Sequence, residues 1–294
     1  MTGRRPRVSV DAFQIAAGPF SFTAHAAGPP DGRLVLLLHG FPQSSFEWRH
    51  QMAVLAAAGH RAVAVDQRGY SPGARPEGVE HYRIEHLVAD VLAVADALGA
   101  RHFDVVGHDW GGAVAWMVAA RHPQRVRTLA AVSMPHPAAF AAALAGDGEQ
   151  AEKSGYIAML RAEGVAEQAL LAGDGDGLRR VFAGTGHPDP DDTGEYVKLL
   201  QQPGALTAAL NWYRALPVEE AAALVDGLGP IGVPTLYVWG EDDTALGRTA
   251  AEGSAGHVEG PYRFEALPGV GHWIPEEVPE RLSELLLEHL AAHP

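Results

Sequence analysis

The chain has 294 residues, of which 47% are hydrophobic and 20% are charged, a balance typical of a globular protein with a sizeable core. Its 22 Lys and Arg residues stand against 36 Asp and Glu, and the net charge of −14 disfavours nucleic acids and anionic membrane surfaces as partners. The absence of cysteine excludes disulfides, thiolate metal sites and a thiol nucleophile. No apolar stretch has the length of a signal peptide or a membrane span, so we expect a cytoplasmic enzyme.

Up to about residue 134, predicted strands alternate with predicted helices. The run from Leu34 to Leu38 is apolar at every position, which is typical of a strand buried on both faces of a parallel sheet. In chain order, the predicted elements are a β-hairpin (8–16 and 20–26), a strand (34–38), a helix (45–58), a strand (62–65), a helix (about 87–98), a strand (103–106), a helix (113–121) and a strand (128–134). This alternation predicts a doubly wound, mostly parallel sheet.

The alternation stops at Pro135-His136-Pro137, and the residues that follow are rich in Ala, Gly and Asp and lack convincing strands. From here on the predicted elements are three helices (155–171, 192–202 and 205–215) with loops at 173–177 and 184–193, then two strands (234–240 and 262–267) and a closing amphipathic helix (276–292). The simplest organisation is an α/β core formed by residues 1–137 and 229–294, interrupted by a helical insertion at 138–228.

The segment 107–112 (Gly-His-Asp-Trp-Gly-Gly) follows a predicted strand and opens the next helix. Its Gly-x-Asp-x-Gly spacing is that of the nucleophile elbow Gly-x-Ser-x-Gly, with Asp109 in the serine position. A sharp strand-to-helix turn leaves no room for side chains beside its central residue, so flanking glycines would present Asp109 to a pocket. The motif alone is equally compatible with a glycine-rich loop whose aspartate caps the helix.

Two further segments with candidate catalytic groups follow predicted strands. Residues 239–243 (Trp-Gly-Glu-Asp-Asp) carry three acids, and residues 269–273 (Gly-Val-Gly-His-Trp) carry one histidine. The chain order nucleophile, acid, histidine is that of the α/β hydrolases. Each segment alone is a weak indication, but three in this order, each after a predicted strand, indicate one shared site.

With these motifs together, the chain resembles the α/β-hydrolase superfamily and, within it, the epoxide hydrolases and the related haloalkane dehalogenases. The resemblance covers nearly the whole chain and rests on the motifs His-Gly-Phe-Pro (39–42), Asp-Gln-Arg-Gly-Tyr (66–70), Gly-His-Asp-Trp-Gly-Gly (107–112), Trp-Gly-Glu-Asp-Asp (239–243) and Gly-His-Trp (271–273). In that family the acid is the third residue after the glycine of the Trp-Gly turn, which implies Asp243, with Asp242 and Glu241 as alternatives. The implied triad is therefore Asp109, Asp243 and His272.

By the same resemblance, the insertion at 138–228 corresponds to the family's helical cap, or lid. The sequence Leu-Asn-Trp-Tyr-Arg at 210–214 is similar to the epoxide hydrolase segment that supplies one ring-opening tyrosine, which implies Tyr213. Tyr156 matches the position of the second tyrosine on a looser alignment. Either tyrosine could instead be an ordinary core residue of an amphipathic helix.

The resemblance implies hydrolysis of an epoxide to a vicinal diol, with no cofactor and no metal. Asp109 is ionised at neutral pH and would form a covalent alkyl ester without the help of a base. Tyr213 and Tyr156 would donate a proton to the departing oxygen, and His272, oriented by Asp243, would then activate water against the ester.

The remaining expected roles concern the walls of the pocket. The backbone N–H groups of Phe41 and Trp110 would form the oxyanion hole. The side chains of Phe41, Trp110 and Trp273 would line the substrate pocket. We expect His39 and His108 to brace the backbone at its floor, and Arg68 to anchor its own loop.

Two other functions stay open from the sequence alone. A haloalkane dehalogenase would use the same Asp109 and bind halide through Trp110, but it usually carries Asn or another halide donor where Phe41 stands and needs no cap tyrosines. A non-catalytic ligand-binding protein is the second alternative, since a fold does not determine a function. The expected partner is a small apolar epoxide, with no nucleic-acid or membrane partner, and the chain is expected to be a monomer or a homodimer.

Overall fold

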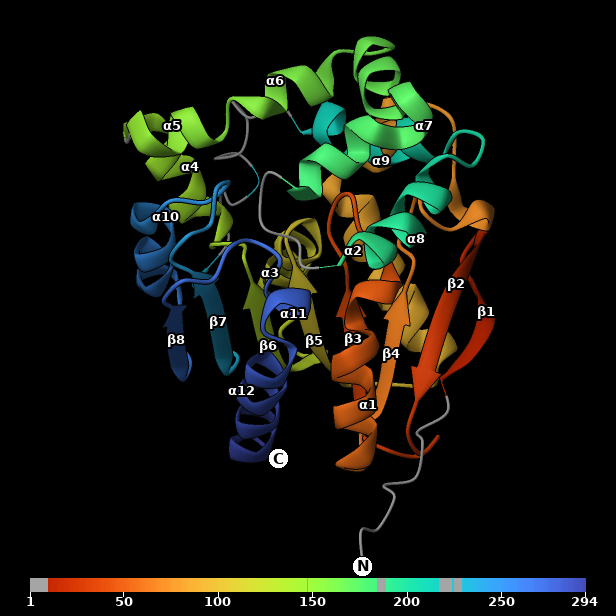
Figure 1. Ribbon diagram of the computed structural model, residues 1–294. Coiled ribbons are helices and arrows are strands. Elements are labelled where there is room, and N and C mark those ends of the chain that lie inside the picture. Colours follow the sequence, from red (N-terminus) through yellow and green to blue (C-terminus); the bar gives the residue numbers. More distant parts are fainter. Residues whose placement is uncertain (1–9, 147, 184–188, 217–223, 225–228) are drawn as a thin grey trace, which may run out of the picture.

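The computed structural model describes residues 10–146, 148–183, 189–216, 224 and 229–294. Within these residues, eight strands form one sheet in the order β1-β2-β4-β3-β5-β6-β7-β8 (Figure 1). β1 and β2 form the predicted antiparallel hairpin, β2 is also antiparallel to β4, and all other neighbouring strands are parallel. The predicted α/β fold with a mostly parallel sheet is therefore confirmed.

The strands are β1 (Asp11–Ala17), β2 (Phe20–Ala27), β3 (Leu34–Leu38), β4 (Arg61–Val65), β5 (Phe103–His108), β6 (Val126–Val132), β7 (Thr235–Gly240) and β8 (Tyr262–Leu267). The helices are α1 (Arg49–Ala57), α2 (Ile84–Ala97), α3 (Trp110–Arg121), α4 (Pro137–Gly146), α5 (Gly148–Lys153), α6 (Tyr156–Arg161), α7 (Val165–Ala183), α8 (Pro190–Leu200), α9 (Ala205–Ala215), α10 (Arg248–Gly253), α11 (Ile274–Glu277) and α12 (Pro279–Ala292).

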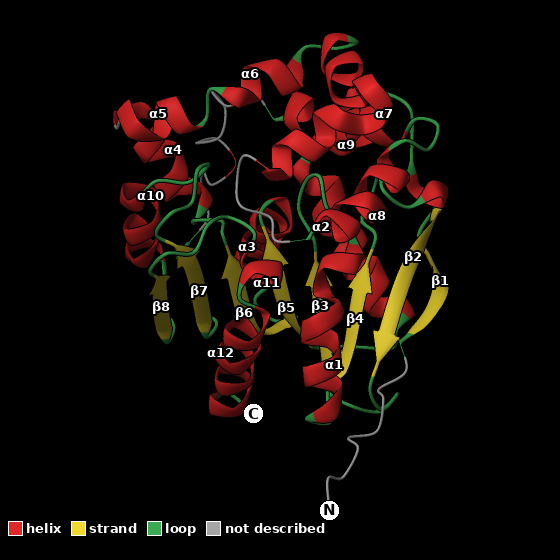
Figure 2. Cartoon of the chain, in the orientation of Figure 1, coloured by secondary structure: helices red, strands yellow, loops and turns green. Residues whose placement is uncertain are grey.

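Alternate residues of the central strands enter two different hydrophobic layers. On β3, Leu34, Leu36 and Leu38 pack in the layer that contains α2 and α3. Val35 and Leu37 pack in the layer that contains α1 and α12. Figure 2 shows the sheet between these two layers of helices. Because both faces of the strand are covered, its sequence is apolar at every position.

Helices α4 to α9 follow β6 and precede β7, and we call them the cap helices. Figure 1 shows them, coloured green to teal, across the end of the sheet toward which the parallel strands point. The described residues between β6 and residue 230 contain no strand. The predicted insertion at 138–228 begins one residue after the start of α4, and part of it lies outside the described residues. Of the predicted loop at 184–193, residues 184–188 lie outside the described residues, and residues 190–193 are the start of α8.

Several predicted boundaries were wrong. The predicted helix at 155–171 is divided into α6 and α7 around Gly164, whose φ of +74° interrupts the helix. The predicted loop at 173–177 is a kink inside α7, with non-helical backbone from Ala172 to Gly175. The closing helix is split into α11 and α12. Helices α4, α5 and α10 were not predicted, because α5 and α10 are very short and α4 consists mostly of alanine, so none gives a clear helical periodicity.

None of the helices that the structure describes is both long enough and apolar enough to cross a membrane.

Candidate active site

Asp109 occupies a sharp turn between β5 and α3. Its φ of +50° and ψ of −122° are sparsely populated by residues other than glycine. A Cβ atom on Gly107 would lie 2.1 Å from the Gly111 carbonyl oxygen, and one on Gly111 would lie 2.1 Å from that of Leu38. Glycine is thus the only residue that fits at positions 107 and 111, two residues before and two residues after Asp109. The turn also holds the carboxylate at the N-terminus of α3, where the helix dipole stabilises negative charge.

The loop after β3 meets this turn. β3 lies between β4 and β5 in the sheet, so the connections from β3 and β5 leave toward opposite sides and open a crevice at their carboxyl ends. The backbone N–H of Phe41 donates a hydrogen bond to Asp109 Oδ1 at 2.8 Å. A Cβ on Gly40 would lie 2.3 Å from the same oxygen, so a glycine is needed before Phe41 for the loop to approach this closely.

His272 lies between two carboxylates. Its Nδ1 is 2.8 Å from Asp243 Oδ2, and its Nε2 is 3.5 Å from Asp109 Oδ2. Asp243 Oδ1 accepts hydrogen bonds from two backbone N–H groups, those of Ala245 at 2.8 Å and Leu246 at 3.0 Å. The side chains of Asp243 and His272 are buried. The structure therefore brings together the three residues that the resemblance implies for the triad.

The two alternative acids point elsewhere. Glu241 and Asp242 are exposed, and Glu241 pairs with Arg248 at 2.7 Å. Only Asp243 turns inward, because the two N–H groups that follow it fix its carboxylate in a tight local turn.

The charges of the triad reinforce one another. Although burial alone lowers the pKa of His272, the negative charge of Asp243 and the hydrogen bond and charge of Asp109 raise it to about 10. Burial raises the pKa of Asp109, but the hydrogen bond and charge of His272 outweigh it and hold this pKa below its usual value. At neutral pH the site therefore holds an imidazolium between two carboxylates.

The backbone of His272 is held from below by two side chains. Its carbonyl oxygen accepts hydrogen bonds from Ser133 Oγ at 2.7 Å and from His108 Nε2 at 2.9 Å. His108 Nδ1 lies 3.2 Å from Glu47 Oε2. Burial lowers the pKa of His108 to about 4 and raises the pKa of Glu47 well above its usual value. The raised pKa of Glu47 favours its neutral form, in which it donates to His108 Nδ1, while the N–H at His108 Nε2 donates to the His272 carbonyl.

Of these residues, the sequence pointed only to His108. Nothing in the local pattern singled out Glu47 or Ser133. The other expected braces are also in place, since His39 Nε2 accepts from the backbone N–H of Gln67 at 3.1 Å. Arg68 pairs with Asp90 at 2.6 Å and 2.7 Å and donates to a backbone carbonyl.

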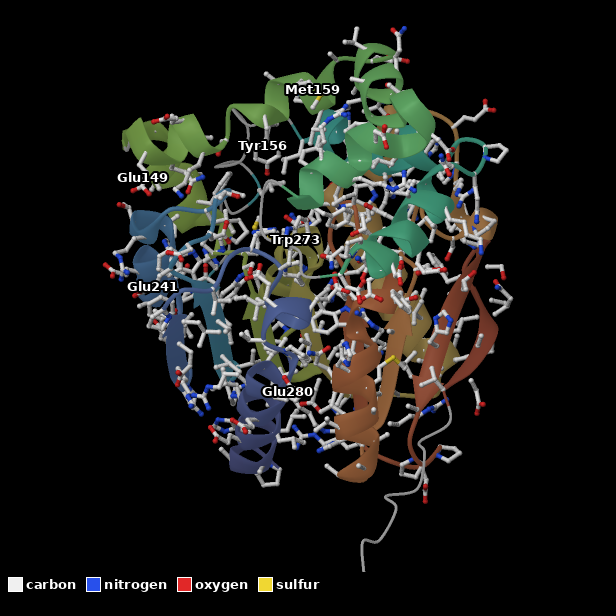
Figure 3. All side chains as sticks on the ribbon, viewed as in Figure 1. Glu149, Tyr156, Met159, Glu241, Trp273 and Glu280 are labelled. Atoms are coloured by element: carbon white, nitrogen blue, oxygen red, sulfur yellow. The ribbon has the colours of Figure 1, made fainter. Side chains whose placement is uncertain are left out.

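Two tyrosines of the cap helices face Asp109. The ring of Tyr213 on α9 packs edge-on against Phe41 and Trp110, with ring centroids 5.4 Å and 5.1 Å away. Its hydroxyl is close enough to the side chains of Trp110 and Tyr156 for these groups to affect the pKa values of the tyrosines. Tyr156 as a whole residue is 42% exposed, while Figure 3 shows its side chain directed from α6 toward the sheet. Burial of the hydroxyls raises the pKa of both tyrosines above the usual value, so both are protonated donors at neutral pH.

Two cavities meet at Asp109. One encloses about 830 Å³ of empty space, partly open to solvent, and is lined mainly by apolar side chains such as Met117, Met134 and Phe140. The other encloses about 780 Å³, also partly open, and is lined by residues that include Phe41, His272 and Trp273. The cavities share Asp109, Ala245 and the two tyrosines. Such a space accommodates an apolar molecule whose single polar group lies at the junction.

A metal site has no support in the part of the chain that the structure describes, where no group of three His, Asp or Glu side chains is arranged to hold an ion.

Known proteins are similar to this chain in both sequence and fold. The family model described as alpha/beta hydrolase fold matches residues 33–279. The chain is 36% identical to the AB hydrolase superfamily protein YfhM of Bacillus subtilis, over 90% of this chain and 92% of that protein. It is 33% identical to epoxide hydrolase A of Mycobacterium tuberculosis, again over 90% of this chain and 92% of the relative.

Solved structures agree with the sequence matches. A structure described as a novel epoxide hydrolase from metagenomes of hot environments superposes with a TM-score of 0.86 at 31% identity, covering 97% of this chain and all of the other. The sheet order, the position of the aspartate turn and the sequence matches agree with one another. The chain belongs to the α/β-hydrolase fold family, in its epoxide hydrolase branch.

Proposed function

We propose that the protein hydrolyses an apolar epoxide to a vicinal diol through a covalent ester on Asp109. The similar proteins named above as epoxide hydrolases support this activity. The observation that carries the mechanism is that two protonated tyrosine hydroxyls and an ionised carboxylate border the same two cavities. This pairing matches the needs of an epoxide, which requires a nucleophile at carbon and an acid at oxygen.

In the first half-reaction, Asp109 Oδ2 attacks an epoxide carbon. Oδ1 is held by the Phe41 N–H, whereas Oδ2 lies on the side of His272, which leaves Oδ2 as the attacking oxygen. The carbon–oxygen bond of the ring breaks, and its electron pair stays on the oxygen, which takes a proton from Tyr213 or Tyr156. Both tyrosines line the same cavities as Asp109, so either hydroxyl can reach that oxygen.

The second half-reaction begins with a change in charge. Esterification neutralises Asp109, which is one of the two groups that raise the pKa of His272. His272 then releases its proton, which restores the tyrosine through solvent, and becomes a base oriented by Asp243. It takes a proton from a water molecule that attacks the ester carbonyl.

The negative charge that develops at Asp109 Oδ1 is stabilised where the backbone N–H groups of Phe41 and Trp110 already lie. When the ester carbon–oxygen bond breaks, the acid proton of Asp109 moves to the departing alkoxide. The diol leaves, and Asp109 is again a carboxylate beside a protonated His272.

The rest of the molecule completes this proposal. We assign residues 138–228 as the cap that supplies both tyrosines, and Trp273, Phe41 and Trp110 as walls that contact the substrate. The state of assembly that we expect, a monomer or a homodimer, can be measured by analytical ultracentrifugation.

A variant without the general base tests the mechanism. His272→Gln keeps the nucleophile but removes the base, so the ester forms and is not hydrolysed. We expect intact-mass spectrometry after incubation with styrene oxide and other apolar epoxides to show an adduct equal to the whole epoxide mass. Asp109→Ala, which has no nucleophile, is the control and should show no adduct.

The same experiment distinguishes the alternatives. Incubation with haloalkanes would give an adduct lighter than the substrate by one hydrogen halide if the protein were a dehalogenase. The two protonated tyrosines at the cavity argue against that activity, because displacement of a halide needs no proton donor. No adduct with any epoxide or haloalkane, together with an inactive wild-type protein, would contradict the proposal and favour a binding protein.

A further inference from the structure

The loop that carries Asp243 is completed by side chains of a cap helix. We call residues 241–247, between β7 and α10, the acid loop. Several of its backbone groups pair within the core, such as Asp242 N–H with the Val270 carbonyl at 3.0 Å. Three others pair with helix α5, namely the Asp243 carbonyl, the Ala245 carbonyl and the Gly247 N–H.

Gln150 on α5 forms two of these bonds. Its Nε2 donates to the Ala245 carbonyl at 2.9 Å, and its Oε1 accepts from the Gly247 N–H at 2.8 Å. Nε2 also donates to Ser154 Oγ at 3.0 Å, which fixes the orientation of the amide. Gln150 is fully buried, so both ends of its amide need these partners. One side chain therefore holds the acid loop at two points, as a neighbouring strand would.

Lys153 forms the third bond. Its ammonium donates to the Asp243 carbonyl at 2.6 Å, and its side chain is 24% exposed. This bond reaches the backbone of the residue whose carboxylate contacts His272, 2.8 Å away. Figure 3 labels Glu149 of α5 above Glu241 of the acid loop, and the two segments also meet at Gly247, where a Cβ would lie 3.5 Å from the Glu149 carboxyl carbon.

We propose that Gln150 and Lys153 are positioning residues for Asp243, so that α5 aligns the acid and through it the base of the hydrolytic half-reaction. The kinetic part of this inference rests on the proposed function. Neither residue is expected to matter for the attack on the epoxide, because Asp109 is held by its own turn and by the Phe41 N–H. The cap would thus serve both half-reactions, through its tyrosines in the first and through α5 in the second.

The kinetic test separates the two half-reactions. Lys153→Met and Gln150→Met keep the length of the side chain and remove its bonds to the loop. With styrene oxide in quenched-flow experiments read by intact mass, we expect the rate of ester formation to stay within about twofold and the rate of ester hydrolysis to fall roughly tenfold to a hundredfold. The ester should therefore accumulate to a larger fraction in the steady state.

Lys198→Met is the matched control for charge. Lys198 lies on another cap helix, α8, and is exposed, so the same substitution there should change neither rate. Equal losses in both half-reactions, unchanged rates in Lys153→Met, or the same effect in Lys198→Met would overturn the proposal. Thermal unfolding of each variant identifies any loss that comes from misfolding of Gln150→Met, in which case Lys153→Met decides.

A second measurement does not depend on turnover. The proton between His272 Nδ1 and Asp243 gives a far-downfield resonance in a one-dimensional proton NMR spectrum, which is assigned by its absence in His272→Gln. We expect Lys153→Met and Gln150→Met to shift or broaden this resonance, and Lys198→Met to leave it unchanged. An unaltered resonance in both variants would contradict the positioning role, even if the protein turned over no epoxide. A perturbed resonance in a protein that forms no ester would instead contradict only the proposed function.

Discussion

The chemistry of the site depends on the interaction between the charges of Asp109 and His272. Asp109 and His272 are both buried enough that each alone would favour its neutral form. Together with Asp243 they favour the charged forms, which gives an ionised nucleophile and a protonated histidine. The histidine cannot act as a base in that state. The proposed ester removes one of the two negative charges and so produces the base only after the nucleophile has reacted.

Asp109→Asn tests this dependence because the amide is neutral, as the ester is. We expect the pKa of His272, about 10 in the wild type, to fall by at least one unit, because the charge of Asp109 is one of the causes that raise it. The measurement is a pH titration of the imidazole by NMR, with intact mass to verify that residue 109 stays asparagine. If the pKa of His272 in the variant equals that of the wild type, Asp243 alone raises this pKa.

The same titration has a consequence for stability. The pKa of His272 in the folded protein, about 10, lies above its ordinary value of 6.5, so protonation favours the folded state. This contribution is fully present below about pH 6.5 and is lost as the pH rises through 10. In Asp109→Asn the contribution should be smaller, and its loss, which begins near pH 6.5 in both proteins, should be complete at a lower pH. Urea unfolding across this range measures the difference.

At the scale of single elements, the sequence revealed those parts of the site that are fixed by local sterics. Gly107 and Gly111 are required by close contacts with backbone atoms, and Gly40 by close contact with the Asp109 side chain. Such contacts leave short motifs that can be recognised in a sequence. The buried strands were equally clear, because two covered faces need apolar residues at every position. Asp243, Tyr213 and Tyr156 came from resemblance alone, since acid-rich turns and helical tyrosines have no distinct local pattern.

The parts that the sequence did not reveal depend on pairs that are far apart in the chain. Glu47 is 61 residues from His108, Ser133 is 139 from His272, and Gln150 is 97 from Gly247. In each case a polar residue is buried because a distant group satisfies it. Neither periodicity nor spacing along one helix carries that information.

The aspartate turn also allows a test at the scale of the element. Gly111→Ala would bring a Cβ within 2.1 Å of the Leu38 carbonyl, and neither α3 nor β3 can move without disturbing the core. We expect a loss of about 1–3 kcal/mol in the free energy of unfolding, as for overpacked cores. Urea denaturation followed by circular dichroism gives the value.

Gly194→Ala is the matched control, since Gly194 lies within α8 and a Cβ there would meet no atom within 4 Å. Alanine at such a helical position should stabilise the protein by about 0.4–1 kcal/mol. If the free energy of unfolding changes in the same direction in Gly111→Ala and Gly194→Ala, the steric explanation of the turn is contradicted.

At the scale of the whole molecule, the proposed reaction needs the cap helices to stay fixed on the core, because Asp109 lies on the core whereas Tyr213 and Tyr156 lie on cap helices. One link is the acid loop with α5, and another lies at the opposite side of the cap. There Arg49, the first residue of α1, forms an ion pair with Asp192 of α8 and with Glu276 of α11, the latter at 2.6 Å. Tyr196 of α8 donates to the same Glu276 at 2.8 Å. Glu276 is thus a buried anion shared by core and cap.

Arg49→Met should lower the free energy of unfolding more than the loss of an exposed ion pair would. The substitution removes the Arg49 cation from Glu276, whose side chain is 1% exposed, while Gln43 and Tyr196 still donate to it. We expect a loss of about 2–4 kcal/mol in the free energy of unfolding, below the value for a pair in which both partners are buried, because Arg49 is 22% exposed. Urea denaturation measures it.

Arg281→Met provides the comparison that makes the result informative. Arg281 is 42% exposed and pairs with Glu265 and Glu284 on the surface of the core, at 3.6 Å and 3.4 Å. Its loss should cost less than about 1 kcal/mol, because water screens exposed pairs. If both variants lose the same free energy of unfolding, the burial of Glu276 does not make its pair with Arg49 stronger than an exposed pair. The cap must then be held mainly by its apolar contacts with the core.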